Sequence, residues 1–115
     1  MQRSVRNDRE FYETDDFIFV HASYDPAQPM IRQSGQMLRW ESVSPAKAAP
    51  HCSGKTAIAG HSRQMTGEVL DLGFLKVIDT NASGGGWLTA LEVTSNEVIQ
   101  ANQKGQLRRQ ATTPG

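Results

Sequence analysis

The chain has little of what usually identifies a class of protein at once. It contains 115 residues and one cysteine, Cys52, so it can form no intrachain disulfide, and this composition is compatible with a reducing compartment. No apolar stretch is long enough to span a bilayer, and the first residues contain no apolar core of a signal peptide. We therefore expect a soluble, cytoplasmic protein without a membrane as partner.

A surplus of either charge is also absent. Twelve Lys and Arg residues balance 12 Asp and Glu residues, so the formal net charge is zero. Arg108 and Arg109 are adjacent, but two residues are too few for a basic patch, so we expect no nucleic acid as partner. With 37% hydrophobic residues, the chain can form one domain or part of one.

Two short apolar segments each end close to a histidine. Residues 17–23 read FIFVHAS, and residues 56–62 read TAIAGHS. Continuous apolar runs of this length are typical of strands buried on both faces. If the two strands are neighbours, His21 and His61 meet at one edge of the sheet, and two neutral imidazoles are a common beginning of a transition-metal site. Each histidine could instead be structural or belong to a surface turn, and these residues alone leave that alternative open.

The other segments predict a chain that is mostly β, with little helix. Residues 1–16 should be a polar lead-in, helical at most around residues 8–12, and residues 104–115 a disordered tail. The glycine-rich stretch 80–86 permits close approach of the backbone to a ligand. The remaining predicted elements are a short helix within residues 30–40 that Trp40 anchors, a hairpin of residues 68–72 with 75–79, and a hairpin of residues 87–93 with 97–101.

Two partial motifs near Cys52 lack the residues that their chemistry requires. SGKT at 53–56 matches the end of a phosphate-binding P-loop, but Ala49 occupies the position of its first glycine, and a strand follows where a helix is needed. His51 and Cys52 match the opening of a cysteine-dependent phosphatase signature, but Ile58 occupies the position of its phosphate-binding arginine. We expect His51 and Cys52 to be ordinary loop residues.

Several segments together resemble a known family. FVHASYDP, LRW, SGKTAIAGHS and IDTNASGGGWLTALEV occur in this order within residues 11–109. They resemble the carboxyl-terminal half of a bacterial serine/threonine phosphoprotein phosphatase of the calcineurin-like metallophosphoesterase superfamily. The resemblance implies an α/β fold that is mostly β in this chain, with residues 17–103 forming half of a β-sandwich with flanking helices. It also implies a site for two divalent ions (Mn, Fe or Zn), with His21 and His61 as metal ligands, and a phosphoprotein or small phosphomonoester as substrate.

The chain departs from this family in ways that bear on activity. The motifs Gly-Asp-x-His-Gly, Gly-Asp-x-x-Asp-Arg-Gly and Gly-Asn-His-Glu, which carry the other ligands and the general acid, are absent from the sequence. Ser62 replaces a usual Thr. Ser42 replaces a phosphate-binding arginine of a bacteriophage relative, and the nearby Arg39 is the candidate substitute. The alternative is a solvated arginine beside a packed tryptophan.

The departures lead to three expectations for the isolated chain. It should bind at most one metal ion, weakly, and it should have no phosphatase turnover alone. It should also associate with itself or with an amino-terminal half, because runs such as FIFV and TAIA form adhesive strand edges when they are unpaired. A non-catalytic remnant that serves as a binding or structural module is the alternative.

Overall fold

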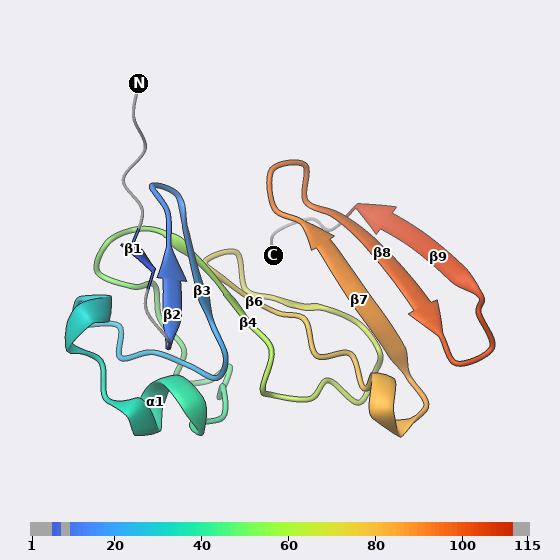
Figure 1. Cartoon of the computed structure of the whole chain (residues 1–115), viewed down its shortest axis with the longest axis horizontal. Coiled ribbons are helices and arrows are strands. Elements are labelled where there is room, and N and C mark those ends of the chain that lie inside the picture. The colour runs from blue at the N-terminus through green and yellow to red at the C-terminus, as the bar shows by residue number, and fades with distance from the viewer. Residues whose placement is uncertain (1–5, 8–9, 112–115) are drawn as a thin grey trace.

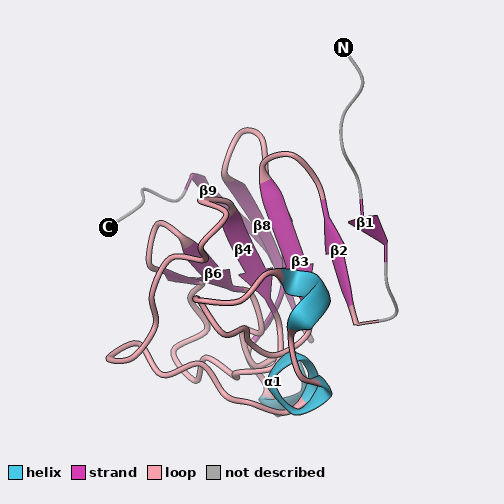
Figure 2. Ribbon diagram, turned by 90° about the vertical axis from the view of Figure 1, so that its left-hand side faces the viewer, coloured by secondary structure: helices cyan, strands magenta, loops and turns pink. Residues whose placement is uncertain are grey.

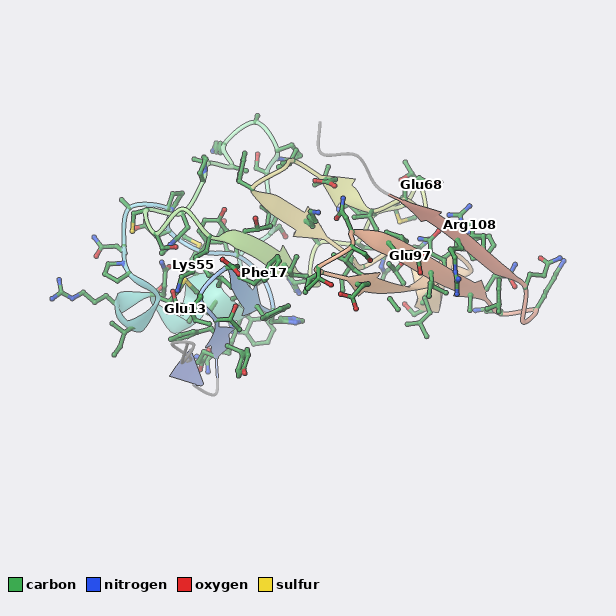
Figure 3. All side chains as sticks on the ribbon, turned by 90° about the horizontal axis from the view of Figure 1, so that it is seen from above. Glu13, Phe17, Lys55, Glu68, Glu97 and Arg108 are labelled. Carbon is green, nitrogen blue, oxygen red and sulfur yellow. The ribbon has the colours of Figure 1, made fainter. Side chains whose placement is uncertain are left out.

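The chain folds in a computed structural model into two β-sheets, which lie side by side along the longest axis of the molecule (Figures 1 and 3). The structure describes residues 6–7 and 10–111. The six-stranded sheet has the order β1-β2-β3-β4-β6-β5, and the three-stranded sheet the order β7-β8-β9. The elements are β1 (Arg6–Asn7), β2 (Phe11–Glu13), β3 (Phe17–Val20), η1 (Met30–Arg32), α1 (Gly35–Arg39), β4 (Thr56–Ala59), β5 (Leu70–Asp71), β6 (Leu75–Val77), η2 (Ala82–Gly84), β7 (Trp87–Glu92), β8 (Glu97–Asn102) and β9 (Leu107–Ala111).

The predicted mostly-β character is confirmed, and so are both predicted hairpins. β5 pairs with β6, and β7 pairs with β8, in each case antiparallel. The helical content of residues 30–40 is limited to η1 and one turn and a half of α1. No helix in the described ranges has the length and apolarity to cross a membrane.

Parallel pairing defines the centre of the larger sheet. β3 pairs in parallel with β4, and β4 in parallel with β6. Both apolar runs, FIFV and TAIA, are therefore interior strands with a partner on each side, and the expectation that they form exposed edges is wrong. The edge strands are β1 and β5. Their short lengths of two residues each limit how much unpaired backbone they present.

One face of this sheet is covered by the segment that connects β3 to β4. Figure 2 shows α1 and the adjoining loops on one side of these strands. Alternate residues of the strands point into this core, and side chains from the connection fill the space between them. The core contains Phe11, Ile18, Val20, Tyr24, Met30, Leu38, Ala57, Ala59, Leu75 and Val77.

The opposite face of the larger sheet is less covered. Phe19 lies between Tyr12 and Phe17, with ring centroids 6.0 Å and 6.2 Å away. Tyr12 remains 40% exposed, whereas Ile58, further along the same face, is buried. An aromatic row near β2 is therefore open to solvent.

Residues 1–16 are not merely a polar lead-in, because β2 is a strand of the sheet. Phe11 of this strand is buried in the core. Glu13 is also buried, and its carboxylate lies 3.0 Å from the Lys55 ammonium (Figure 3). The predicted helix around residues 8–12 is wrong where the structure describes those residues, and residues 8–9 lie outside the described part. Three residues are too few for an alternating pattern to stand out, so only the partners across the fold reveal the strand.

The prediction of a disordered tail over residues 104–115 is also wrong for residues 107–111. These residues form β9, which pairs with β8. Arg108 accounts for this order: its guanidinium carbon lies 3.9 Å from the centroid of the Trp87 ring, and one of its nitrogens donates to the Gly67 carbonyl at 2.9 Å. Arg108 also donates to the buried side chain of Gln100. These partners are distant in the sequence, which is why local composition suggested a tail. Residues 112–115 lie outside the described part.

Trp40 does not anchor the short helix as expected. Its side chain is 62% exposed, whereas Leu38 is 3% exposed and faces the core. In a helix this short, two residues of separation place side chains on opposite sides. Because Leu38 takes the position that faces the core, the larger side chain of Trp40 lies in solvent.

Tyr24 makes the stability of this core sensitive to high pH. Its hydroxyl donates to the Ala49 carbonyl at 2.8 Å, and burial raises the pKa of the phenol from 10.0 to about 12. The phenol ionises more readily in the unfolded chain than in the folded chain. Its contribution to the free energy of unfolding is therefore complete below about pH 10 and is lost as the pH rises through about 12.

We predict that Tyr24→Phe lowers the free energy of unfolding by about 1 kcal/mol at neutral pH, because a hydrogen bond is lost. The variant should also lose less stability than the wild type under alkaline conditions. Urea unfolding at several pH values up to about 12 measures both effects. Tyr12→Phe, at an exposed tyrosine, is the matched control and should keep the wild-type slope, and equal slopes for wild type and Tyr24→Phe would contradict the prediction.

Candidate metal centre

His21 and His61 lie next to each other at the carboxyl ends of β3 and β4. The carbonyl oxygen of His21 accepts hydrogen bonds from the amides of both Gly60, at 2.9 Å, and His61, at 2.8 Å. These two bonds continue the parallel pairing beyond the last residue of each strand. The imidazole centroids are 4.9 Å apart and the ring planes are inclined by 57°. The prediction that the two strands are neighbours in one sheet is confirmed. Metal binding by the histidines stays a prediction.

Two imidazoles in this arrangement are within reach of a single ion. A metal–nitrogen bond is about 2.1 Å long, so small side-chain rotations suffice to direct one nitrogen of each ring to a shared position. His21 is exposed and His61 half-buried, which leaves room for further ligands. In the described part of the chain, no group of three or more His, Cys, Asp or Glu residues could hold a metal ion.

An open depression of about 420 Å³ lies beside His21. It extends from the ends of the central strands over the aromatic row near β2. Its walls are largely apolar, so it suits a protein surface or an apolar group better than a free phosphate. The lining residues are Glu10, Phe11, Tyr12, Phe19, Val20, His21, Ile58, Ala59, Gly60 and Ile78.

Arg39, the predicted phosphate-binding residue, is close to His21 through the backbone. The Ala22 amide donates to the Leu38 carbonyl at 2.9 Å, so the end of α1 is attached to the residue that follows His21. The guanidinium, however, lies 2.9 Å from the Glu10 carboxylate. Because Glu10 offsets part of its charge, Arg39 would have to share or exchange this partner to bind phosphate. Its role in phosphate binding stays a prediction.

Glu10 is the residue near this site that the sequence did not reveal. β2 and β3 are antiparallel, with Phe11 opposite Val20, so continuing this register places Glu10 opposite His21. Recognising β2 as a strand would have predicted the position of Glu10. The polar and charged residues on either side of β2 made this short strand resemble part of a solvated segment.

A hydrogen bond of Ser62 connects the end of β4 to the loop that covers the core. Its hydroxyl oxygen accepts a hydrogen bond from the Val43 amide at 2.7 Å. The position follows His61 directly, so the bond restrains the backbone that carries one of the two imidazoles. A threonine at this position would carry the same hydroxyl and preserve the acceptor.

Two glycines of the glycine-rich stretch lie against other atoms of the same stretch, and its approach to a ligand stays a prediction. A Cβ atom on Gly86 would lie 2.5 Å from the Thr80 carbonyl oxygen, and one on Gly84 would lie 2.3 Å from the Asn81 side chain. The Gly86 amide donates to the Asn81 carbonyl at 2.7 Å. These glycines therefore permit the tight turn that leads from β6 into β7.

His51 is a buried structural residue. Its Nε2 lies 2.7 Å from the Gln28 carbonyl, and its Nδ1 accepts a hydrogen bond from the Ser53 amide at 3.1 Å. Nδ1 must then carry a lone pair and Nε2 the proton, so neither nitrogen is available to a metal ion. Cys52 is an exposed free cysteine. Both residues therefore agree with the expectation of ordinary loop positions.

Comparisons of this chain with protein-family models, with curated proteins and with solved structures found no match. The phosphatase interpretation therefore depends on the sequence segments that resemble the family and on the geometry of the two histidines.

We predict that Ser62→Ala lowers the free energy of unfolding by about 1 kcal/mol, because the Val43 amide loses its acceptor. Thermal unfolding measures the loss, and hydrogen exchange should be faster at Val43. Ser62→Thr should retain most of the stability. Ser44→Ala, at an exposed serine of the same loop, is the matched control. A loss no larger for Ser62→Ala than for Ser44→Ala would rule out this role of the hydroxyl.

Proposed function

We propose that this chain supplies the two-histidine side of a dinuclear metal centre in a metal-dependent phosphomonoesterase of the serine/threonine protein phosphatase type. The proposal rests on one observation: the imidazoles of His21 and His61 are 4.9 Å apart at the ends of two parallel strands. The order of the family-like segments along the chain supports the same assignment. The substrate would be a phosphoprotein or a small phosphomonoester.

The two histidines can perform only part of the chemistry. Neutral imidazole donates a lone pair to Mn²⁺, Fe or Zn²⁺, and the backbone bonds to the His21 carbonyl hold both rings at one position. Two ions about 3.5–4 Å apart bind the phosphoryl group in such enzymes and activate a water molecule. This arrangement needs a bridging carboxylate and an acid for the leaving group. The motifs that carry these groups are absent from the sequence.

An amino-terminal half would therefore complete the site. The depression beside His21 and the open aromatic row provide an apolar surface at the position where additional ligands are needed. Burial of Tyr12 and its neighbours by such a segment would stabilise the complex, and the same segment would exclude water from the metal centre. Arg39 is placed to contribute positive charge at this boundary.

The alternative, a non-catalytic module, is favoured by a different observation. Arg39 is engaged by Glu10, and no third ligand accompanies the histidines in the described residues. In that case His21 and His61 would only pack against each other and present polar ring nitrogens to solvent. Metal binding and turnover distinguish the two functions.

We predict that Mn²⁺ binds weakly to the isolated chain at His21 and His61. Paramagnetic broadening of the histidine ring signals in NMR spectra is the measurement. Signals of His21 and His61 should broaden together, whereas those of the buried His51 should persist at the same concentration. His21→Ala and His61→Ala should each lower the affinity by roughly tenfold or more. Equal broadening of all three histidines, or none, would exclude this site.

We also predict that the chain alone has no metal-dependent phosphatase turnover, because hydrolysis of a phosphomonoester has a very high barrier without both ions and a general acid. Hydrolysis of p-nitrophenyl phosphate with Mn²⁺ should remain at the background rate of the free metal. Addition of a polypeptide that contains the three absent motifs should produce turnover, and His61→Asn should abolish it. Turnover by the pure wild-type chain that His61→Asn removes would show that the chain is a complete enzyme.

A further inference from the structure

The outer face of the three-stranded sheet is apolar and exposed. Side chains alternate along β7, so that Leu88 and Ala90 are exposed while Thr89 between them is half-buried. The strand register places Leu88 opposite Ala101, and Ala101 opposite Leu107. Leu88 is 68% exposed and Leu107 is 74% exposed. We call this surface the outer face; it comprises Leu88, Ala90, Glu92, Glu97, Ile99, Ala101, Leu107 and Arg109.

The inner face of the same sheet is mixed. Val98 is fully buried there, and Trp87 and Leu91 are half-buried. Thr89, Gln100 and Arg108 are the polar residues of this face. Gln100 is 1% exposed, and its amide nitrogen donates to the Gly67 carbonyl at 3.0 Å and to the Thr89 hydroxyl at 2.8 Å. Arg108 donates to the same Gly67 carbonyl. These polar side chains attach the sheet to the rest of the chain, while Leu88 and Leu107 remain exposed on its other face.

We propose that the outer face binds a second copy of this chain, with the two three-stranded sheets packed face to face about a two-fold axis parallel to the strands. The residues of the outer face form three rows across the strands. Leu88, Ala101 and Leu107 form an apolar row at one end, and Glu92 and Glu97 lie at the other end. The choice of axis follows from these rows.

An axis parallel to the strands keeps each row opposite the same row of the partner. Leu88 then faces Leu107 of the partner subunit. The two β8 strands lie against each other, so Ile99 faces Ile99 and Glu97 faces Glu97 of the partner subunit. A two-fold axis across the strands would instead place the apolar row against Glu92 and Glu97, and would bury carboxylates without a cation. The parallel axis therefore packs the apolar row of Leu88, Ala101 and Leu107 against the same row of the partner. Arg109, 3.7 Å from Glu97 in its own chain, offsets part of the charge of the two facing carboxylates.

Charge complementarity supports the same arrangement. With this axis, Glu92 lies diagonally opposite Arg109 of the partner subunit. The carboxylate of Glu92 accepts hydrogen bonds from the side-chain hydroxyl and from the backbone amide of Thr94. The hydroxyl has the larger effect, and both bonds hold the pKa of the Glu92 carboxyl below its usual value. Glu92 is therefore ionised at neutral pH. Arg109 is 66% exposed and lies 3.7 Å from Glu97, which leaves its guanidinium free to reach a second carboxylate.

The size of the outer face predicts a weak dimer. Strands of six residues with a rise of about 3.4 Å, spaced by about 4.8 Å, give a surface of roughly 20 by 14 Å. Two copies together would then bury less than about 1,200 Å², the range of transient complexes. The formal net charge of zero adds no repulsion between copies. Dimerisation should therefore depend on concentration in the micromolar range or above.

Sedimentation velocity of the full chain over a wide concentration range tests the proposal. Wild type should shift from monomer to dimer, and Leu88→Lys and Leu107→Lys should each weaken the association at least tenfold. Ile31→Lys replaces an apolar residue that is 65% exposed elsewhere, and Tyr12→Lys alters the open face of the larger sheet, so both should leave the dimer unchanged. Circular dichroism confirms that each variant is folded.

A charge exchange tests the orientation. Glu92→Arg should weaken the dimer, and the double variant Glu92→Arg with Arg109→Glu should restore it. A wild-type chain that remains monomeric at every concentration would overturn the proposal. A dimer that Tyr12→Lys dissociates, or one that Leu88→Lys leaves intact, would also overturn it, because the interface would then lie elsewhere. Failure of the double variant to restore association would refute the axis.

Discussion

Parallel pairing between β3 and β4 is the constraint on which the rest of this structure depends. Parallel neighbours cannot be joined by a tight turn, so the chain between them must cross the sheet. That crossover contains α1 and the core residues Tyr24 and Leu38, and it covers one face of the strands. The same pairing ends at the His21 carbonyl, which accepts two amides from the end of β4. One arrangement of hydrogen bonds therefore accounts for both the core and the position of the two imidazoles.

The site that results brings two imidazoles together beside an open apolar depression. The backbone holds His21 and His61 together, while the surroundings offer an open apolar depression and an arginine whose charge Glu10 partly offsets. A metal ion that performs hydrolysis needs anionic ligands as well as imidazoles, because carboxylates bridge ions and balance their charge. A second protein segment that brings carboxylates and covers the depression would satisfy both needs at once.

The two sheets of the chain present apolar surface for different reasons. In the larger sheet, the open aromatic row adjoins the histidines, and covering it would also complete the proposed centre. In the smaller sheet, Gln100 and Arg108 face inward and bind the Gly67 carbonyl on the same side as the buried Val98. Leu88 and Leu107 lie on the opposite side of this sheet and remain exposed.

The sequence by itself determined the elements whose pattern is local: the two apolar strands that lead to His21 and His61, and the two hairpins. Apolar runs mark the two strands, and turn residues such as Gly73 and Asn96 between β-rich segments mark the hairpins. The tertiary structure alone decided the rest. β2 and β9 are strands because Lys55 pairs with Glu13 and because Gly67, Trp87 and Gln100 bind Arg108. The exposure of Trp40 and the pairing of Arg39 with Glu10 likewise follow from where α1 meets β3. These interactions join residues far apart in the chain, and no local pattern records the energy of such contacts.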